Sequence, residues 1–239
     1  MREEHLQVLY QDKAILVLDK PAGLAVHPGP RTPHSLEALL PGLAARLGLH
    51  RRPVLMHRLD RDTSGCLLLA LKPAAVRHLS RLFEARQVRK TYWAILDKVP
   101  DEDGGTINMP LAKVSSAQAG WRMAPDSRGK PAVTTWRVLD RTTGLVAFQP
   151  LTGRTHQLRV HANCLGTAIT GDPVYGRPEE RRTDQERAGA VQGMRLHARQ
   201  LEMPMPDRSV LTVCAPLPPG WPAPPADIQA GDLAIFNNL

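Results

Sequence analysis

The chain has 239 residues, 42% of them apolar, and carries 31 Lys and Arg residues against 23 Asp and Glu residues, a formal net charge of +8. This length and composition fit one medium or two small globular domains and exclude a disordered or membrane-spanning chain. No apolar run approaches the roughly eighteen residues of a membrane-spanning helix, and residues 1–13 lack the basic and apolar regions of a signal peptide. We therefore expect a cytoplasmic protein without a membrane partner, whose positive charge is compatible with a polyanion.

The first fifty residues alternate apolar runs with turn signals. Residues 7–12 and 14–20 each contain an apolar run typical of a strand, and together they predict a strand pair. Residues 35–49 have helical spacing, with Ser35 as the expected N-cap. Because Pro41 falls inside this stretch, we expect one broken helix or two short ones.

The middle of the chain continues this alternation of strands and helices. The expected elements are a strand at 66–72, a helix within 72–90, a strand at 90–98 and a β-hairpin within 129–155. Residues 155–166 then turn to helical spacing, with Thr155 as a candidate N-cap and Gly166 as a candidate C′ residue.

The last third contains a charged segment, a strand pair and a proline-rich tail. Residues 177–193 predict an exposed insertion or loop, and residues 195–204 and 209–216 predict two strands. The tail covers about residues 220–239. Many short strands with a few helices indicate an α+β fold around a mixed, mostly antiparallel sheet. Without a linker in its middle, the chain is expected to form a single domain over residues 1–239.

The stretch HRLDRDTSG, residues 57–65, places a carboxylate between cations just before an apolar run. Arg58 and Arg61 flank Asp60, and nearby positive charge favours the ionised form and lowers a carboxylate pKa. The alternative is a surface turn with local ion pairs, which contribute little to stability. The apolar run that follows favours the first interpretation, because the start of a buried strand fixes the orientation of the cluster.

Two further polar stretches, KTYWAIL and LTGRTHQLRVH, could carry chemistry. Lys90 and Tyr92 lie two apart and share a strand face, where the tyrosine ring is either part of the core or a surface on which a base stacks. His156 and Arg159 lie three apart and share a helix face. The alternative there is an amphipathic helix with a solvated basic side.

Other common sites are not indicated. The three cysteines have no metal-ligand spacing, and the histidines do not form an H-E-x-x-H pattern, so we expect no metal. Phosphate-binding glycine loops and a G-x-S-x-G nucleophile elbow are also missing from the sequence. These patterns predict a protein without a nucleotide cofactor.

Taken together, the motifs resemble those of the RluA-type family of RNA pseudouridine synthases. The resemblance rests on HRLDRDTSG, with KPAGLAVHP before it and KTYWAIL, LTGRTHQLRVH and GDPVYG after it, and it runs from about Asp19 to about Pro218. It implies the pseudouridine synthase fold in a single catalytic domain. It also implies an isomerase that converts uridines of ribosomal or transfer RNA to pseudouridine without a cofactor. Because KPAG begins at Lys20, we expect the form that lacks an extra N-terminal RNA-binding domain.

The resemblance also implies roles for individual residues. Asp60 is the catalytic aspartate, Tyr92 packs on the uracil ring, and Arg159 forms a salt bridge to Asp60. Arg58 inserts into the RNA where the target base leaves the stack, at a cost of a few kcal/mol for flipping. The expected RNA-binding set is Arg58, His57, Lys90, Arg154 and His156.

Several alternatives stay open at this point. The same scaffold could serve as a non-catalytic RNA-binding or RNA-folding module, although such a module has no need for a paired carboxylate. Substrate choice is expected to come from loops such as residues 28–50 and 177–193. The sequence has no exposed apolar stripe that demands a partner, so a monomer is expected.

Overall fold

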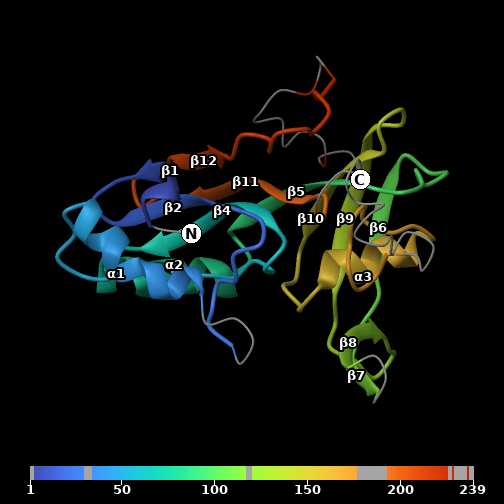
Figure 1. Cartoon of the computed structure of the whole chain (residues 1–239), viewed down its shortest axis with the longest axis horizontal. Coiled ribbons are helices and arrows are strands. Elements are labelled where there is room, and N and C mark those ends of the chain that lie inside the picture. The colour runs from blue at the N-terminus through green and yellow to red at the C-terminus, as the bar shows by residue number, and fades with distance from the viewer. Residues whose placement is uncertain are drawn as a thin grey trace. The chain divides into compact units, whose positions relative to one another are not determined.

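The computed structural model describes residues 3–29, 34–116, 120–176, 193–225, 228 and 236. It divides into two compact units, which we call unit 1 (Met1–Lys90 and His197–Pro218) and unit 2 (Thr91–Leu196 and Pro219–Leu239). The elements, labelled in Figure 1, are the 3-10 helix η1 (Glu3–His5), α1 (Leu36–Arg46), α2 (Pro73–Glu84), α3 (Gln157–Cys164), β1 (Gln7–Gln11), β2 (Ile15–Lys20), β3 (Val54–Leu55), β4 (Ser64–Ala70), β5 (Arg89–Ile95), β6 (Gly104–Asn108), β7 (Leu111–Ser116), β8 (Gly120–Pro125), β9 (Val133–Asp140), β10 (Leu145–Pro150), β11 (Leu196–Pro204) and β12 (Val210–Cys214).

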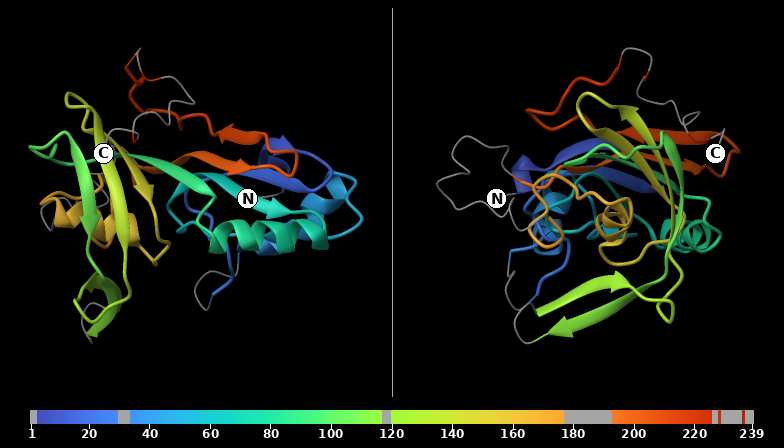
Figure 2. Two further views of the ribbon diagram at one scale, coloured as in Figure 1. Left: turned by 180° about the vertical axis from the view of Figure 1, so that it is seen from behind. Right: turned by 90° about the vertical axis from the view of Figure 1, so that its right-hand side faces the viewer.

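Unit 1 is a sheet covered by two helices. Its strands follow the order β1-β2-β4-β11, with β12 paired to β11 and β3 paired to β4. The β4–β11 pair is parallel and the others are antiparallel. Helices α1 and α2 lie on the same face of this sheet (Figures 1 and 2). Every residue of β4 is buried, because the strand lies inside the sheet with a helix across one face.

Helix α1 differs from the prediction at its proline. The sequence predicted one broken helix or two short ones, whereas α1 is a single helix that contains Pro41. The missing N–H of Pro41 removes one bond, to the carbonyl of Glu37. Pro41 is exposed and Glu37 is half-exposed, so water can satisfy that carbonyl. The predicted N-cap is confirmed, since the Ala38 N–H donates to Oγ of Ser35.

Unit 2 combines an antiparallel sheet with one hairpin and one helix. The sheet follows the order β5-β10-β9-β6, and β9 and β10 form the predicted hairpin. The separate β7–β8 hairpin extends away from this sheet (Figure 2). Helix α3 packs against β8 and β10. Its residue Val160 joins Leu111 and Ala132 in a small apolar cluster at the base of the hairpin.

The predicted α+β class and the mixed, mostly antiparallel sheet are confirmed. The assignment of residues 1–239 to a single domain stays a prediction beside the division into two units. Residues 177–192, most of the predicted charged insertion, lie outside the described residues, as does most of the tail after Gly220. No helix in the described part of the chain is long and apolar enough to cross a membrane.

The ends of α3 give one confirmation and one correction. The helix is followed by Leu165 and by Gly166 with φ +74°, as expected for a C′ glycine. Thr155 was predicted to be the N-cap, but the N-cap residue is His156, whose φ of 54° is left-handed. His156 makes no side-chain capping bond; instead, Oε1 of Gln157 reaches back and accepts the N–H of Arg154, before the helix.

Candidate active site

Asp60 lies in the loop of residues 57–63, which joins β3 to β4 and is called the HRLD loop below. Its backbone carbonyl accepts the Thr63 N–H at 3.2 Å, which closes a turn directly before β4. Leu59 is buried and Asp60 is half-exposed, whereas the Arg58 side chain is exposed. The other expected flanking cation, Arg61, forms an exposed ion pair with Asp62 (Nε to Oδ1, 3.0 Å). The carboxylate is thus carried on a short turn that a buried leucine anchors.

A fully buried lysine lies beneath the HRLD loop. Lys20 ends β2, and its Nζ donates to the carbonyls of Pro21 (2.7 Å), Leu24 (2.8 Å) and Arg61 (3.0 Å). The third bond ties the KPAG turn to the residue that follows Asp60. Burial lowers the pKa of Lys20 to about 7, although the charges of Asp62, Asp60 and Asp19 oppose that decrease. Lys20 therefore fixes the backbone of the HRLD loop from below.

Replacing Lys20 with Met should loosen this loop. Met retains most of the apolar volume but leaves three carbonyls without their donor, so the free energy of unfolding should fall by about 1–3 kcal/mol. Turnover should fall as well, since the Arg61 carbonyl is no longer held. Urea unfolding and an activity assay measure the two effects. The exposed Lys13 gives a matched control, and equal behaviour of Lys20→Met and Lys13→Met would contradict this role.

The TSG end of the motif is explained by close packing against β11. Gly65 has φ +103° and lies beside Ala198 in the parallel β4–β11 pair; a Cβ at Gly65 would lie 2.3 Å from the Ala198 carbonyl oxygen. Only glycine fits both conditions. Next to it, Oγ of Ser64 is 2.8 Å from Nδ1 of His197, a buried contact between the same strands. These contacts fix the start of β4, and with it the HRLD loop.

His57 connects the HRLD loop to β4 and α2. The Leu68 backbone N–H donates to its Nε2 at 3.0 Å, so the ring is neutral at that nitrogen. The ring lies 5.6 Å from the ring of Phe83, over which the Lys90 ammonium also lies. Burial, with a contribution from Lys90, lowers the pKa of His57 to about 3. These contacts position the loop; the assignment of His57 and Lys90 to RNA binding stays a prediction.

The low pKa of His57 predicts a loss of stability in mild acid. The unfolded histidine gains a proton near pH 6.5, but the folded ring does so only at about pH 3, so the unfolded state binds more protons between these values. Lowering the pH from 7 to 5 should therefore reduce the free energy of unfolding by about 2 kcal/mol through His57 alone. Urea unfolding at both pH values measures this loss. His57→Gln should reduce it, whereas the same change at the exposed His50 should not, and an undiminished loss in His57→Gln would refute the assignment.

In unit 2, Gln157 holds together the loop that precedes α3. Its Oε1 accepts from the Thr152 hydroxyl (2.8 Å) and the Arg154 N–H, and its Nε2 donates to the Val133 carbonyl and the Thr134 hydroxyl. The side chain of Arg154, predicted to bind RNA, donates its Nε to the carbonyl of Pro131 at 2.9 Å. The loop and the β9 strand are thereby fixed to each other.

Arg159 is buried in α3 and is held by a carboxylate that the sequence analysis did not single out. Its Nε and Nη2 donate to Oδ2 and Oδ1 of Asp172 at 2.7 and 2.8 Å. Oδ1 also accepts the backbone N–H groups of Val174 and Tyr175. Burial raises the pKa of Asp172, but the bonds and charge of Arg159 and the two N–H groups outweigh it, so the pKa lies below its usual range. This two-bonded pair fixes the plane of the Arg159 guanidinium.

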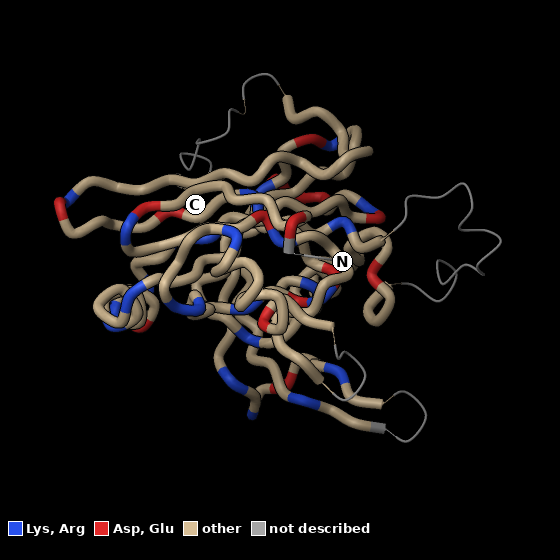
Figure 3. The backbone as a smooth tube through the Cα atoms, turned by 60° about the vertical axis from the view of Figure 1, so that its left-hand side comes forward, with Lys and Arg blue, Asp and Glu red and all other residues tan. Residues whose placement is uncertain are grey.

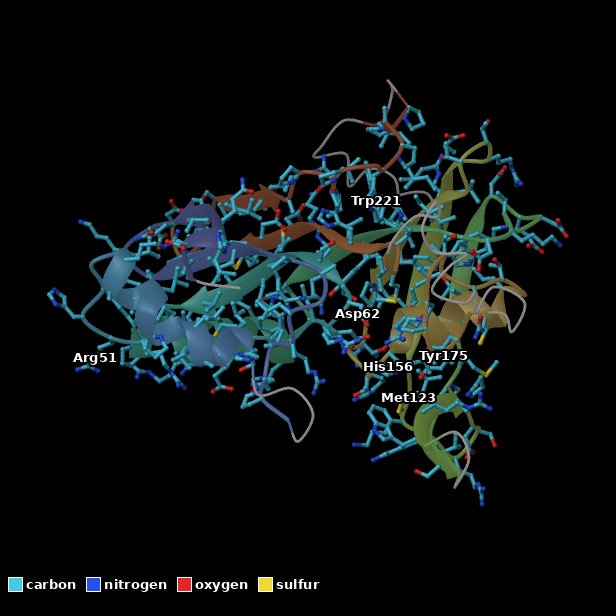
Figure 4. All side chains as sticks on the ribbon, viewed as in Figure 1. Arg51, Asp62, Met123, His156, Tyr175 and Trp221 are labelled. Carbon is cyan, nitrogen blue, oxygen red and sulfur yellow. The ribbon has the colours of Figure 1, made fainter. Side chains whose placement is uncertain are left out.

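Tyr175 packs under this guanidinium and reaches His156. The Cζ of Arg159 lies 5.0 Å from the Tyr175 ring centre, and the Tyr175 hydroxyl is 2.9 Å from Nδ1 of His156. The same hydroxyl accepts the Met123 N–H of β8. Figure 4 labels Met123, His156 and Tyr175, which lie together beside α3 and the β7–β8 hairpin. His156 is thus half-buried beside the arginine that was expected to be catalytic.

Tyr92, the expected uracil-packing residue, is buried in β5 opposite Phe148 of β10. Asp60 belongs to unit 1, whereas Tyr92 and Arg159 belong to unit 2. The expected salt bridge between Asp60 and Arg159 therefore stays a prediction. Within unit 2, however, the expected residues Arg154, His156 and Arg159 come from one loop and helix.

Sequence reasoning missed Lys20, Asp172 and Tyr175 as supporting residues. All three fall in quoted stretches, KPAG and GDPVYG, which were read only as part of the resemblance. An aspartate followed by proline and a lysine after an apolar run are ordinary turn and strand-end patterns. Their signal was their place inside these two stretches, which accompany the motifs whose residues had assigned roles.

Comparisons with known proteins identify the family to which the chain belongs. The family described as RNA pseudouridylate synthase matches residues 14–163. An uncharacterized RNA pseudouridine synthase of Zymomonas mobilis is 47% identical over 215 residues, which cover 89% of this chain and 94% of the relative. The ribosomal large subunit pseudouridine synthase D of Nitrosomonas europaea is 36% identical over 98% of this chain, which spans 66% of that relative.

A solved structure of a similar protein supports the same family. The protein titled human RNA pseudouridylate synthase domain containing 4 is 32% identical and superposes with a TM-score of 0.73, covering 89% of this chain and 88% of its own. The family match over residues 14–163 and the identity to these relatives extend well beyond the HRLD loop. The chain belongs to the RNA pseudouridylate synthases of the RluA type, and it is an isomerase that converts uridine in RNA to pseudouridine.

Proposed function

We propose that this chain isomerises one or more uridines of ribosomal RNA, with Asp60 as the catalytic carboxylate. The observation that carries the proposal is how unit 1 holds Asp60. Lys20 binds the carbonyl of the next residue, and Gly65 lets β11 approach the strand that follows. Such support fixes the position of a reacting group. Relatives named as ribosomal large subunit pseudouridine synthases favour ribosomal over transfer RNA.

The reaction needs neither a redox partner nor an energy source, because uridine and pseudouridine are isomers. The bond from N1 to C1′ breaks, the base turns, and a bond from C5 to C1′ forms. The C5 hydrogen leaves as a proton, and N1 ends with a proton. Asp60 acts either at C1′ or on the departure of uracil, and the proposed general base for the C5 proton is Tyr92.

The remaining proposed roles concern RNA binding and the orientation of Arg159. Arg58, exposed on the HRLD loop, fills the space left by the flipped uridine and offsets part of the cost of flipping. Arg159, which the family resemblance pairs with Asp60, is held in place by Asp172. Lys and Arg, blue in Figure 3, are distributed along the chain, and they supply phosphate contacts. We place the enzyme in the cytoplasm as a monomer.

A tritium-release assay tests the proposal directly. RNA transcribed with uridine tritiated at C5 loses tritium to water whenever C5 becomes bonded to C1′. Three substrates, unmodified large-subunit ribosomal RNA, small-subunit ribosomal RNA and transfer RNA, separate the possible targets. We expect release from large-subunit RNA. Release from transfer RNA alone would overturn the ribosomal assignment, and RNA binding without release from any substrate would favour a non-catalytic RNA-binding module.

A further inference from the structure

The β7–β8 hairpin exposes an aromatic side chain on one of its two faces. Because side chains alternate along a strand, Trp121 and Met123 of β8 share a face with Lys113 of β7, while Val114 and Arg122 lie on the other. Trp121 is 49% exposed, and it is the one aromatic residue among the exposed large apolar side chains in the part of the chain that the structure describes. A single exposed indole is ordinary on a protein surface, so the contacts around Trp121 decide whether it has a binding role.

The indole is held in a fixed orientation from the α3 side. Its ring stacks on the His156 ring, with centres 5.4 Å apart and planes 19° apart. His156 in turn meets the edge of Tyr175, over which the Arg159 guanidinium lies. The Tyr175 hydroxyl binds both His156 and the Met123 N–H, and Trp121 stands in strand β8. Little conformational freedom of these side chains is therefore left for a ligand to remove. One continuous row of rings thus connects an exposed tryptophan to Arg159.

The charges around the indole favour a polyanionic ligand. The Lys113 ammonium lies 5.0 Å from the Trp121 ring centre. Residues 111–130 contain four basic side chains, at positions 113, 122, 128 and 130, against the single acidic Asp126. Asp126 is itself neutralised by Arg128, 3.6 Å away. The ammonium lies over this ring, on which His156 also stacks, so a base gains a ring face when the Lys113 ammonium moves from the ring to the phosphate of the same nucleotide.

We propose that Trp121 is a stacking platform for an unpaired nucleotide of the RNA substrate, and that Lys113 binds the phosphate of that nucleotide. Trp121 is then a positioning residue, because it holds the RNA beside the row of rings that ends at Arg159 and does not touch the reacting atoms. This inference rests on RNA as the substrate, which it extends by assigning a contact outside the HRLD loop and the KTYWAIL and LTGRTHQLRVH stretches.

The test combines a binding assay with the tritium-release assay. The binding probe is a fluorescein-labelled oligonucleotide of uridine, because stacking tolerates any base. The change Trp121→Leu removes the π face but keeps an apolar side chain, and it should raise Kd by about five-fold or more. Trp121→Phe should restore most of the affinity. On ribosomal RNA, KM should rise while kcat at saturating RNA stays near the wild-type value.

Matched controls come from the opposite face of the same hairpin. Val114→Ala and Arg122→Gln should change Kd less than Trp121→Leu and Lys113→Gln, respectively. If wild type binds and reacts but Trp121→Leu equals it, the stacking role is refuted while the enzyme assignment stands. If wild type neither binds nor reacts, the proposed function itself fails. Unchanged RNA binding with a loss of dimers in light scattering would show that the indole meets a second copy of the chain and would overturn the inference.

Discussion

Replacing Asp60 with Asn should abolish pseudouridine formation and leave the fold and the RNA affinity intact. Asn has the same size, and the bond that closes the turn uses the Asp60 backbone carbonyl, which the change does not touch. Loss of the proposed catalytic carboxylate should lower turnover by roughly a thousand-fold or more, about 4 kcal/mol of activation free energy. Tritium release measures turnover, and fluorescence titration with the same RNA measures affinity.

The neighbouring Asp62 provides the matched control for this change. It stands two positions later in the same loop, and its carboxylate pairs with the exposed Arg61. Asp62→Asn should retain most of the wild-type turnover, because an exposed ion pair contributes little. Appreciable turnover by Asp60→Asn, or an equal loss in Asp62→Asn, would remove Asp60 from the catalytic role.

Replacing Asp172 with Ala should strongly destabilise unit 2. The side chain of Asp172 is fully buried and that of Arg159 is 5% exposed, so Asp172→Ala removes two charge-assisted hydrogen bonds from a buried guanidinium. Breaking such a pair costs about 3–5 kcal/mol. The N–H groups of Val174 and Tyr175 lose their acceptor as well. Urea unfolding measures the loss, and turnover should fall because the guanidinium is no longer oriented.

An exposed ion pair of the same unit gives the comparison. Asp103 accepts from Arg141 at 2.7 Å, but their side chains are 86% and 48% exposed, so Asp103→Ala should cost at most about 1 kcal/mol. The double change Arg159→Met with Asp172→Leu should cost less than Asp172→Ala alone, because the buried guanidinium that Asp172 binds is removed together with the carboxylate. Similar losses for Asp172→Ala and Asp103→Ala would contradict the importance of the buried pair.

The sequence predicted most of the strands because their apolar runs are continuous. The strand predicted at residues 66–72 corresponds to β4 (Ser64–Ala70), buried along its whole length, and the strand pairs near both termini formed as expected. Pro41 was given too much weight as a helix breaker, since the lost bond lies on a half-exposed side of α1. The β7–β8 hairpin was not predicted. Its exposed Trp121 and Val114 disturb the alternation of apolar and polar residues that marks a half-buried strand.

The expected site residues were found by their motifs, whereas the residues that hold them in place were not. Asp60 and Arg159 stand in stretches whose family roles could be transferred position by position. The partner of Arg159, Asp172, is thirteen residues away along the chain across a helix end, and only the fold brings them together. Lys20 was read as the end of a strand, because lysine is almost never fully buried without partners. Its three carbonyl partners come from turns whose geometry no periodicity encodes.

The most direct test of the central claim, that this chain isomerises uridine in ribosomal RNA through Asp60, is pseudouridine mapping in cells. Total RNA would be compared among a strain with the gene, a strain without it, and deletion strains that carry either the wild-type gene or Asp60→Asn. We predict that one or more pseudouridines of large-subunit ribosomal RNA disappear on deletion, return with the wild-type gene and stay absent with Asp60→Asn. Return of the same sites with Asp60→Asn would contradict the account.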